Sequence, residues 1–212
     1  FKFSDADMRA DTAFYDTFLV DRRGLRNYWE LRQLDNRFEI TTFKSKVPGR
    51  PANMLSLGAR HALLLLHQEP GDSTFSNVFL TGRLGIAPTD NIEIVARGEL
   101  GMLNNFGEYL VDASARVGLG KVGYLRGNLL SQRTPPSMLH HKLYVSKQLF
   151  WDNDFEKPEE TTLSASYVMP RLGFEVTGQT HLINNFLYYD QLGLAKQTTS
   201  PVRTEKEMPF KA

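Results

Sequence analysis

Charged side chains recur at alternate positions along several short segments of the chain. The candidate site residues are Arg83, Glu93, Arg97, Glu99, Asp112, Arg116, Arg126 and Glu175. Charges of both signs on one surface could set an electric field that steers ions or polar solutes. The same residues could instead be a solvated surface whose opposite charges neutralise one another and stabilise strand pairing. Both interpretations fit the residues.

The residues around these charges alternate between apolar and polar types with a period of two. From Ile92 to Met102, and again from Tyr109 to Val117, nearly every second residue is apolar. Successive side chains of a strand point to opposite faces of a sheet, so each segment is predicted to be a strand with one apolar and one charged face. Each segment also has about the length, roughly 9–11 residues, that a tilted strand needs to cross a bilayer.

Similar segments separated by turn residues extend over most of the chain. About ten or eleven strands and no convincing helix are expected, which makes the fold all-β, an antiparallel up-and-down meander. Asp35 and Asn36 predict a tight turn, because both residue types tolerate a left-handed backbone. Residues 138–151 are predicted to form a single strand, since apolar and polar side chains alternate there.

The expected organisation has three parts. Residues 1–24 form an N-terminal segment whose structure the pattern does not predict, because helical and strand spacings both fit it. Residues 25–190 form the antiparallel sheet. Residues 191–212 form a polar C-terminal tail.

Composition excludes several classes of protein. The 212 residues include 25 basic and 24 acidic side chains, so the net charge of +1 gives no indication of a nucleic-acid partner. No Cys is present, which excludes disulfides and thiol chemistry. The longest apolar run, residues 62–66, is far shorter than the roughly 18–20 residues of a membrane-spanning helix. A membrane β-barrel stays possible, because its lipid-facing surface uses only every second residue.

The apolar face could pack into a soluble core or could face lipid. It is rich in small residues such as Ala96, Gly98, Ala113 and Ala115, which fill a core poorly. Aromatic residues cluster near strand ends, where membrane barrels carry interfacial girdles. The predicted interfacial aromatic residues are Trp29, Trp151, Phe155, Tyr188 and Tyr189. These features favour a transmembrane β-barrel over a soluble barrel or sandwich.

Neither catalysis nor a cofactor is indicated. No nucleophile elbow, phosphate-binding loop or zinc-binding helix motif occurs. His140 and His141 are adjacent, so on a strand they would point to opposite faces and could not share a metal. Bulky residues on the expected polar face, Phe79, Leu110 and Tyr144, leave open whether a lumen would be open or filled.

The C-terminal half carries five distinctive segments. They are residues 132–137 (Gln-Arg-Thr-Pro-Pro-Ser), 151–155 (Trp-Asp-Asn-Asp-Phe), 157–161 (Lys-Pro-Glu-Glu-Thr), 170–173 (Pro-Arg-Leu-Gly) and 184–190 (Asn-Asn-Phe-Leu-Tyr-Tyr-Asp). With these segments, residues 75–197 resemble the family of putative porins of Bacteroidota outer membranes. The resemblance is most specific at residues 151–155.

This resemblance implies a β-barrel in the bacterial outer membrane, no catalytic residues and no cofactor. Members of the family are much longer, so we expect this chain to be a segment of a longer protein. The expected function is passive diffusion of small hydrophilic solutes or ions through a lumen lined by the charged face. The expected partners are therefore membrane lipid, these solutes and other outer-membrane proteins, but not nucleic acid. The alternatives are a structural barrel that scaffolds an outer-membrane protein complex, or a soluble β-rich binding module.

Overall fold

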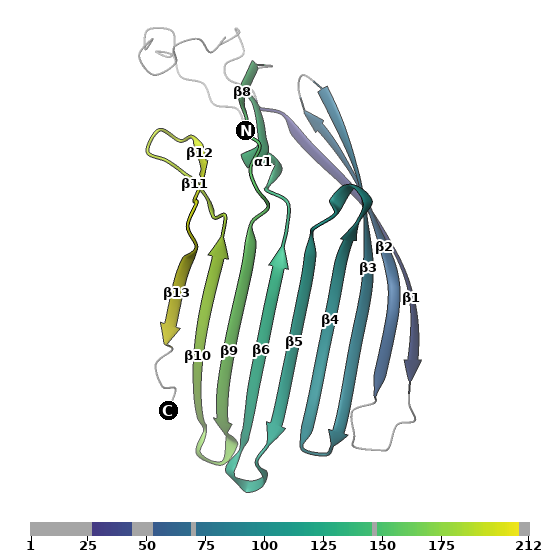
Figure 1. Cartoon of the computed structure of the whole chain (residues 1–212), viewed down its shortest axis with the longest axis vertical. Coiled ribbons are helices and arrows are strands. Elements are labelled where there is room, and N and C mark those ends of the chain that lie inside the picture. The colour runs from purple at the N-terminus through teal and green to yellow at the C-terminus, as the bar shows by residue number, and fades with distance from the viewer. Residues whose placement is uncertain (1–26, 44–52, 69–70, 146–147, 208–212) are drawn as a thin grey trace. The chain divides into compact units, whose positions relative to one another are not determined.

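Most of the chain is extended. The computed structural model describes residues 27–43, 53–68, 71–145 and 148–207, and within them nine strands form one sheet in the order β1-β2-β3-β4-β5-β6-β9-β10-β13 (Figure 1). These strands are β1 Trp29–Phe43, β2 Met54–Gln68, β3 Gly71–Thr89, β4 Ile92–Met102, β5 Tyr109–Gly118, β6 Tyr124–Arg133, β9 Glu159–Met169, β10 Phe174–Asn184 and β13 Val202–Glu207. The predicted all-β, antiparallel meander is confirmed.

The chain divides into two compact units. Unit 1 comprises residues 1–35, 62–76 and 136–155. Unit 2 comprises residues 36–61, 77–135 and 156–212. Strands β1, β2 and β3 contribute residues to both units, whereas β4, β5, β6, β9, β10 and β13 belong wholly to unit 2. All eight charged residues of the predicted site therefore lie in unit 2.

From β4 to β10 the strands of unit 2 pair without a break in the period of two. Ala96 of β4 lies opposite Ala113 of β5, which lies opposite Leu129 of β6, which in turn lies opposite Leu163 of β9. Residues that pair across strands share a face. The apolar positions of one strand therefore continue directly into those of the next, and the polar positions do the same on the other face.

The connections of unit 2 differ in length between the two ends of its strands. At one end, residues 90–91, 119–123 and 170–173 join β3 to β4, β5 to β6 and β9 to β10. At the other end, residues 103–108, 134–158 and 185–201 join β4 to β5, β6 to β9 and β10 to β13. The first group, hereafter the short-turn end, lies at the bottom of Figure 1.

Two glycines permit the close approaches that these connections require. Gly123, just before β6, has a φ of 124°, and a Cβ there would lie 2.1 Å from the backbone oxygen of Val168 on β9. A Cβ at Gly101 would lie 2.1 Å from the backbone oxygen of Asn105, which belongs to the 3-10 turn η1 (Leu103–Asn105). Asn105 is buried, and its Oδ1 accepts a hydrogen bond of 3.1 Å from the backbone N–H of Val78 on β3. The other 3-10 turns are η2 (Gly120–Val122) and η3 (Pro170–Leu172).

Unit 1 corrects the prediction of one strand over residues 138–151. That range contains a single helical turn, α1 (Met138–His141), and a separate hairpin of β7 (Lys142–Val145) and β8 (Gln148–Asp152). The alternation was real, but it belongs to two short strands that pair with each other. The Lys142 ammonium donates a 2.6 Å hydrogen bond to Asp152, which lowers the pKa of that carboxyl and raises the pKa of Lys142.

The predicted tight turn at Asp35 and Asn36 is also wrong, because β1 runs straight through both residues. Asn and Asp permit a left-handed turn without requiring one, and an extended backbone places residues i and i+2 on the same face. The Gln33 amide uses that spacing to donate a 3.3 Å hydrogen bond to Asp35. The predicted N-terminal segment, residues 1–24, lies outside the described residues.

The sheet continues beyond residue 190. The range predicted as a polar tail contains β12 (Ala195–Gln197), which pairs with β11 (Leu187–Tyr189), and β13, which pairs with β10. The final residues, 208–212, lie outside the described part of the chain.

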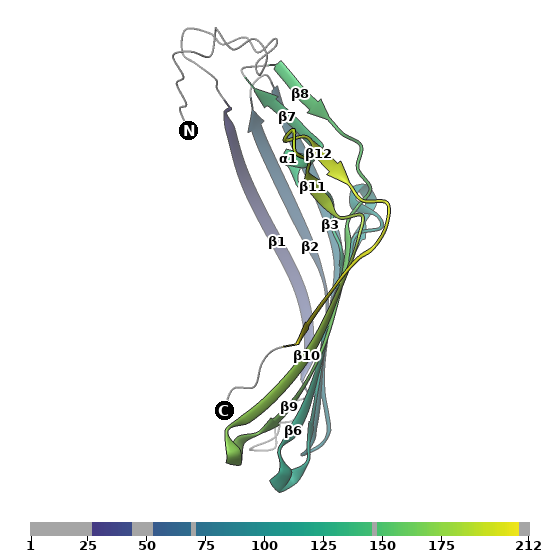
Figure 2. The ribbon, with the colours of Figure 1, turned by 90° about the vertical axis from the view of Figure 1, so that its left-hand side faces the viewer.

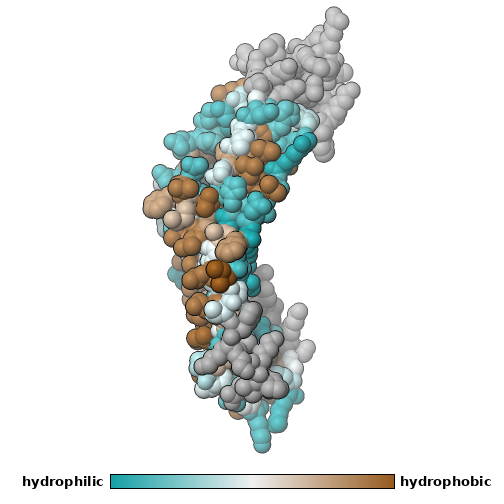
Figure 3. Space-filling model, turned by 90° about the vertical axis from the view of Figure 1, so that its right-hand side faces the viewer, coloured by the Kyte–Doolittle hydropathy of each residue, from teal (hydrophilic) through white to brown (hydrophobic). Residues whose placement is uncertain are grey.

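The described residues form very little hydrophobic core. Only Ala62, Leu66 and Ala195 are buried apolar residues among them. In Figure 2, β6, β9 and β10 lie edge-on in a single layer. Hydrophobic side chains gather along one side of the sheet edge in Figure 3. Within unit 2, no second layer of described residues therefore packs on the apolar face.

Candidate functional site

One face of the unit 2 sheet is apolar across six consecutive strands. Hydrogen-bonded register places on it Leu80, Leu84, Ile92, Ile94, Ala96, Leu100, Val111, Ala113, Ala115, Leu125, Leu129, Leu163, Ala165 and Val176. Many of these side chains are exposed, for example Leu80 and Leu163, each 53% exposed. Ile92, Ile94 and Tyr109 are half-buried and Val111 is exposed, so these four residues do not pack into a core.

The apolar face becomes polar toward the end opposite the short-turn end, where residues 103–108, 134–158 and 185–201 connect the strands. There the Tyr109 hydroxyl donates a 2.7 Å hydrogen bond to Glu159 of β9 and lies 3.3 Å from the Ser131 hydroxyl. Ser131 also bonds to Thr161 of β9 at 3.2 Å. This cluster was not predicted, although Tyr109 stands at the end of an alternating apolar segment. It gives the apolar surface a polar border on strands β5, β6 and β9.

The opposite face carries all eight charged residues predicted as the candidate site. Arg83, Arg97 and Asp112 follow one another across β3, β4 and β5. Glu93, Arg116 and Arg126 do the same across β4, β5 and β6. Glu99 and Glu175 lie on the same face, opposite Thr81 and Val168 respectively. This surface, defined by the eight charged residues, is called the polar face below.

Glu99 is the centre of a charged cluster on the polar face. Arg37 of β1 donates to its carboxylate at 3.0 Å, and Arg60 of β2 forms a second ion pair with it. The Arg60 guanidinium also stacks 4.6 Å above the centre of the Phe79 ring. The predicted site omitted Arg37 and Arg60, although both occupy polar positions of alternating segments, which is the signal that could have found them.

A second set of polar contacts crosses β6, β9 and β10. Glu160 accepts a 2.8 Å hydrogen bond from the Gln132 amide and lies 3.3 Å from Nε2 of His181. The other ring nitrogen of His181 shares a 2.6 Å hydrogen bond with the Thr162 hydroxyl. Further along these strands, Asn128 donates to Ser164 at 3.1 Å. These contacts link neighbouring strands through their polar side chains.

Bulky side chains also occupy the polar face. Phe79 lies under the Arg60 guanidinium, and Leu110 lies opposite Glu99. Tyr144, predicted to lie beside them, belongs instead to β7 in unit 1, where the Lys142 ammonium lies 5.6 Å from its ring centre. The polar face thus carries side chains of different sizes as well as of both charges.

The predicted interfacial aromatic residues are divided between the two units. Trp29, Trp151 and Phe155 belong to unit 1, and the Trp151 indole N–H donates to the Leu139 backbone oxygen at 2.8 Å. Tyr188 and Tyr189 belong to unit 2 and are exposed on β11, in the long connection between β10 and β13. Their place at a lipid interface stays a prediction.

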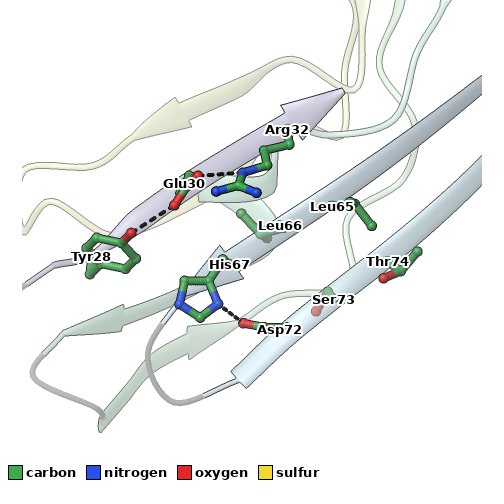
Figure 4. Close-up of a pocket in the computed structure, with 9 residues that line it drawn as sticks. All are labelled: Tyr28, Glu30, Arg32, Leu65, Leu66, His67, Asp72, Ser73 and Thr74. Carbon is green, nitrogen blue, oxygen red and sulfur yellow. Dashed lines mark hydrogen bonds and ion pairs between the residues drawn. The ribbon is translucent and has the colours of Figure 1, made fainter. Parts of the chain in front are cut away.

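Unit 1 contains a cavity of about 420 Å³ between the ends of β1, β2 and β3 (Figure 4). Glu30 accepts hydrogen bonds from the Tyr28 hydroxyl at 2.9 Å and from Arg32 at 2.7 Å. The His67 ring pairs with Asp72 and makes a T-shaped contact with the Tyr28 ring. The charged groups that line this cavity are therefore satisfied by one another, which leaves no obvious ligand-binding chemistry.

Metal binding and helical membrane spans have no structural support in the described residues. They include no group of three or more His, Asp or Glu side chains placed to hold a metal ion. His140 and His141 lie in α1, so the strand argument made for them does not apply. No helix in the described part of the chain is both long and apolar enough to cross a membrane.

Comparison with known proteins supports the resemblance seen in the C-terminal half and extends it. No curated protein and no solved structure matches the chain. A family model described as "Putative porin" matches residues 1–207. Since that match covers nearly the whole chain, the protein belongs to the putative porin family.

Proposed function

We propose that unit 2 is part of the wall of an outer-membrane β-barrel, and that its polar face lines a water-filled lumen through which small hydrophilic solutes diffuse passively. The observation that carries the proposal is the separation of apolar and charged residues onto opposite faces of six hydrogen-bonded strands. A soluble sheet would bury its apolar face against a second layer, whereas a membrane barrel turns that face to lipid.

The length of the strands fits this proposal. Strand β4 runs from Ile92 to Met102 and has 11 residues. The ten steps between them cover roughly 34 Å at about 3.4 Å per residue. At a tilt of about 40° the same strand covers roughly 26 Å along the barrel axis. The apolar band of outer-membrane barrels is about 25 Å tall, so β4 is long enough to cross it.

A barrel in lipid cannot leave a sheet edge unpaired. Among the described residues β1 and β13 are the edges of the nine-stranded sheet. We therefore propose that both edges pair with further strands in the complete barrel. The proposed pore needs no cofactor or catalytic residue, and its selectivity comes from the charges on the polar face.

The lengths of the connections suggest an orientation. Outer-membrane barrels have short periplasmic turns and longer extracellular loops. The short-turn end, with residues 90–91, 119–123 and 170–173, is accordingly proposed to face the periplasm. The start of β2 lies at this end as well, since Asn53, just before β2, accepts a 2.9 Å hydrogen bond from the Ala87 backbone N–H.

The proposal is tested by swelling of liposomes that contain the full-length protein, using uncharged sugars of increasing size. We expect swelling with small sugars that falls off as sugar size rises. Ser114→Trp places an indole on the polar face and should slow the larger sugars, whereas Ala113→Trp, one residue away on the apolar face, should not. Folded, inserted protein without swelling would favour the scaffolding barrel. A folded protein that stays soluble would contradict the membrane placement.

A further inference from the structure

The polar face carries two arginines that lie next to each other on neighbouring strands. Arg116 of β5 and Arg126 of β6 are directly opposite in the register, an arrangement that normally destabilises a sheet. Within the described residues neither guanidinium forms an ion pair with a carboxylate. Arg83 and Arg97 also oppose each other, but Arg97 is bonded to Asp112. The charge of the Arg116 and Arg126 pair is therefore available to bind an anion.

An aromatic ring holds both guanidinium groups in place. Tyr124 lies on the polar face at the start of β6, opposite Gly118, which has no side chain to cover the ring. The Arg116 guanidinium carbon lies 4.3 Å from the centre of this ring and that of Arg126 lies 5.7 Å away. Cation–π contact with one ring keeps two like charges close together and preorganises them.

Two hollows flank Arg116. One of about 470 Å³ is bordered by Arg116, Lys121, Tyr124 and Arg171, and no carboxylate is among its lining residues. The other, of about 320 Å³, is bordered by Arg116, Arg126, Asn128 and also Glu93. Glu93 lies opposite Arg116 and is the acidic group facing the pair. Four basic side chains thus border two hollows that share Arg116, and only the smaller hollow has a carboxylate, Glu93, among its lining residues.

The chemistry of this cluster identifies the class of ligand. A guanidinium is planar and binds phosphate or carboxylate through two parallel hydrogen bonds, while an ammonium adds a point charge. We propose that Arg116, Arg126, Lys121 and Arg171 form a binding subsite for small solutes that carry phosphate groups. The pair lies on the polar face, away from the apolar surface, so a soluble anion fits it better than a lipid headgroup.

The position of the subsite would make the charge of the lumen more positive at one end than at the other. On the other rows of the polar face, Glu99 is paired with Arg37 and Arg60, and Asp112 with Arg97. The basic cluster, with Glu93 as the carboxylate that faces it, lies at the short-turn end, beside the turns that contain Lys121 and Arg171. This consequence for transport rests on the proposed function, whereas binding of the anion does not depend on an open pore.

Binding is tested by calorimetric titration of pyrophosphate into the folded full-length protein in zwitterionic detergent. The double variant Arg116→Gln with Arg126→Gln should bind about tenfold more weakly than the wild type. The matched control, Arg83→Gln with Arg97→Gln, removes the same charge from the other arginine pair and should bind within about twofold of the wild type. Circular dichroism and heat-modified gel mobility establish that each variant is folded.

Three results would overturn the subsite. They are no pyrophosphate binding to the wild type, equal loss of binding in both double variants, and tighter binding of dihexanoyl phosphatidylglycerol with the same arginine dependence. The last result would assign the cluster to a lipid headgroup. Liposome swelling with uncharged sugars is independent of these measurements, so failure of the pore and failure of the subsite are distinguishable.

Discussion

Arg97 and Asp112 lie directly opposite each other on β4 and β5, and Nε of Arg97 donates a hydrogen bond of 3.0 Å to the Asp112 carboxylate. Arg83 stands on the other side of Arg97 in the same row. The Arg97 and Asp112 side chains are 57% and 40% exposed, and such pairs contribute only about 0–1 kcal/mol to stability. Their effect is therefore expected on the field of the polar face rather than on the fold.

Removing the charge of Asp112 should make the pore more selective for anions. In Asp112→Asn, Arg97 loses its neutralising partner and the row keeps two positive charges, which attract anions. The reversal potential in a potassium chloride gradient should move toward the chloride equilibrium potential, and Arg97→Gln should move it the opposite way. Asp154→Asn, which changes the same charge outside the strands, is the control. Identical reversal potentials in all variants would show that this row of residues does not line the pore.

An arginine on the apolar face should destabilise the inserted protein, whereas its neighbour on the polar face should tolerate one. Ala113 and Ser114 are consecutive in the middle of β5 and point to opposite faces. Ala113→Arg should cost roughly 2–4 kcal/mol if residue 113 faces lipid near the midplane, and Ser114→Arg much less. Unfolding from bilayers in denaturant measures both. Equal stabilities would mean that the two faces meet the same solvent.

Gly123 should resist substitution because of its backbone and its neighbour on β9. A φ of 124° is unfavourable for other residues, and a Cβ would lie 2.1 Å from the Val168 backbone oxygen. Gly123→Ala should therefore disturb the turn before β6 and lower folding yield in lipid. Gly127→Ala changes a glycine within β6, where a Cβ has no neighbour within 4 Å, and this variant should fold normally. Comparable yields for the two variants would contradict this account of the turn.

The orientation can be tested because the chain contains no Cys. Leu192, 81% exposed in the long connection before β13, and Leu172, 75% exposed in the turn after β9, mark the two ends of unit 2. In intact cells a membrane-impermeant maleimide should label Leu192→Cys but not Leu172→Cys. Both should react after the outer membrane is permeabilised, which controls for side-chain reactivity. The reverse labelling pattern would invert the proposed orientation.

The period of two was sufficient to predict strand type and the two faces. It placed Ile92, Ile94 and Val111 on one face and Glu93, Arg97 and Asp112 on the other, as the register confirms. It could not predict which residues pair across strands, because a shift of register by two residues leaves the pattern unchanged. Contacts such as Arg97 with Asp112, or Arg116 opposite Arg126, therefore required the structure.

The sequence pattern also could not predict where the chain departs from the meander. Strand β6 pairs with β9, and the residues between them form α1 and the hairpin of β7 and β8 outside the nine-stranded sheet. Short alternating segments fit equally well as part of a large sheet or as a separate hairpin. Likewise, Asp35 and Asn36 permit a turn, but pairing along β1 keeps them extended.

The polar face is proposed to line an open, water-filled pore. Single-channel recording of the full-length protein in a planar bilayer tests it most directly. We expect stepwise currents whose conductance rises with salt concentration, as in a wide aqueous lumen whose ions pass by diffusion. Absence of any current from protein shown to be folded and inserted would contradict the pore and leave a filled barrel with a structural role.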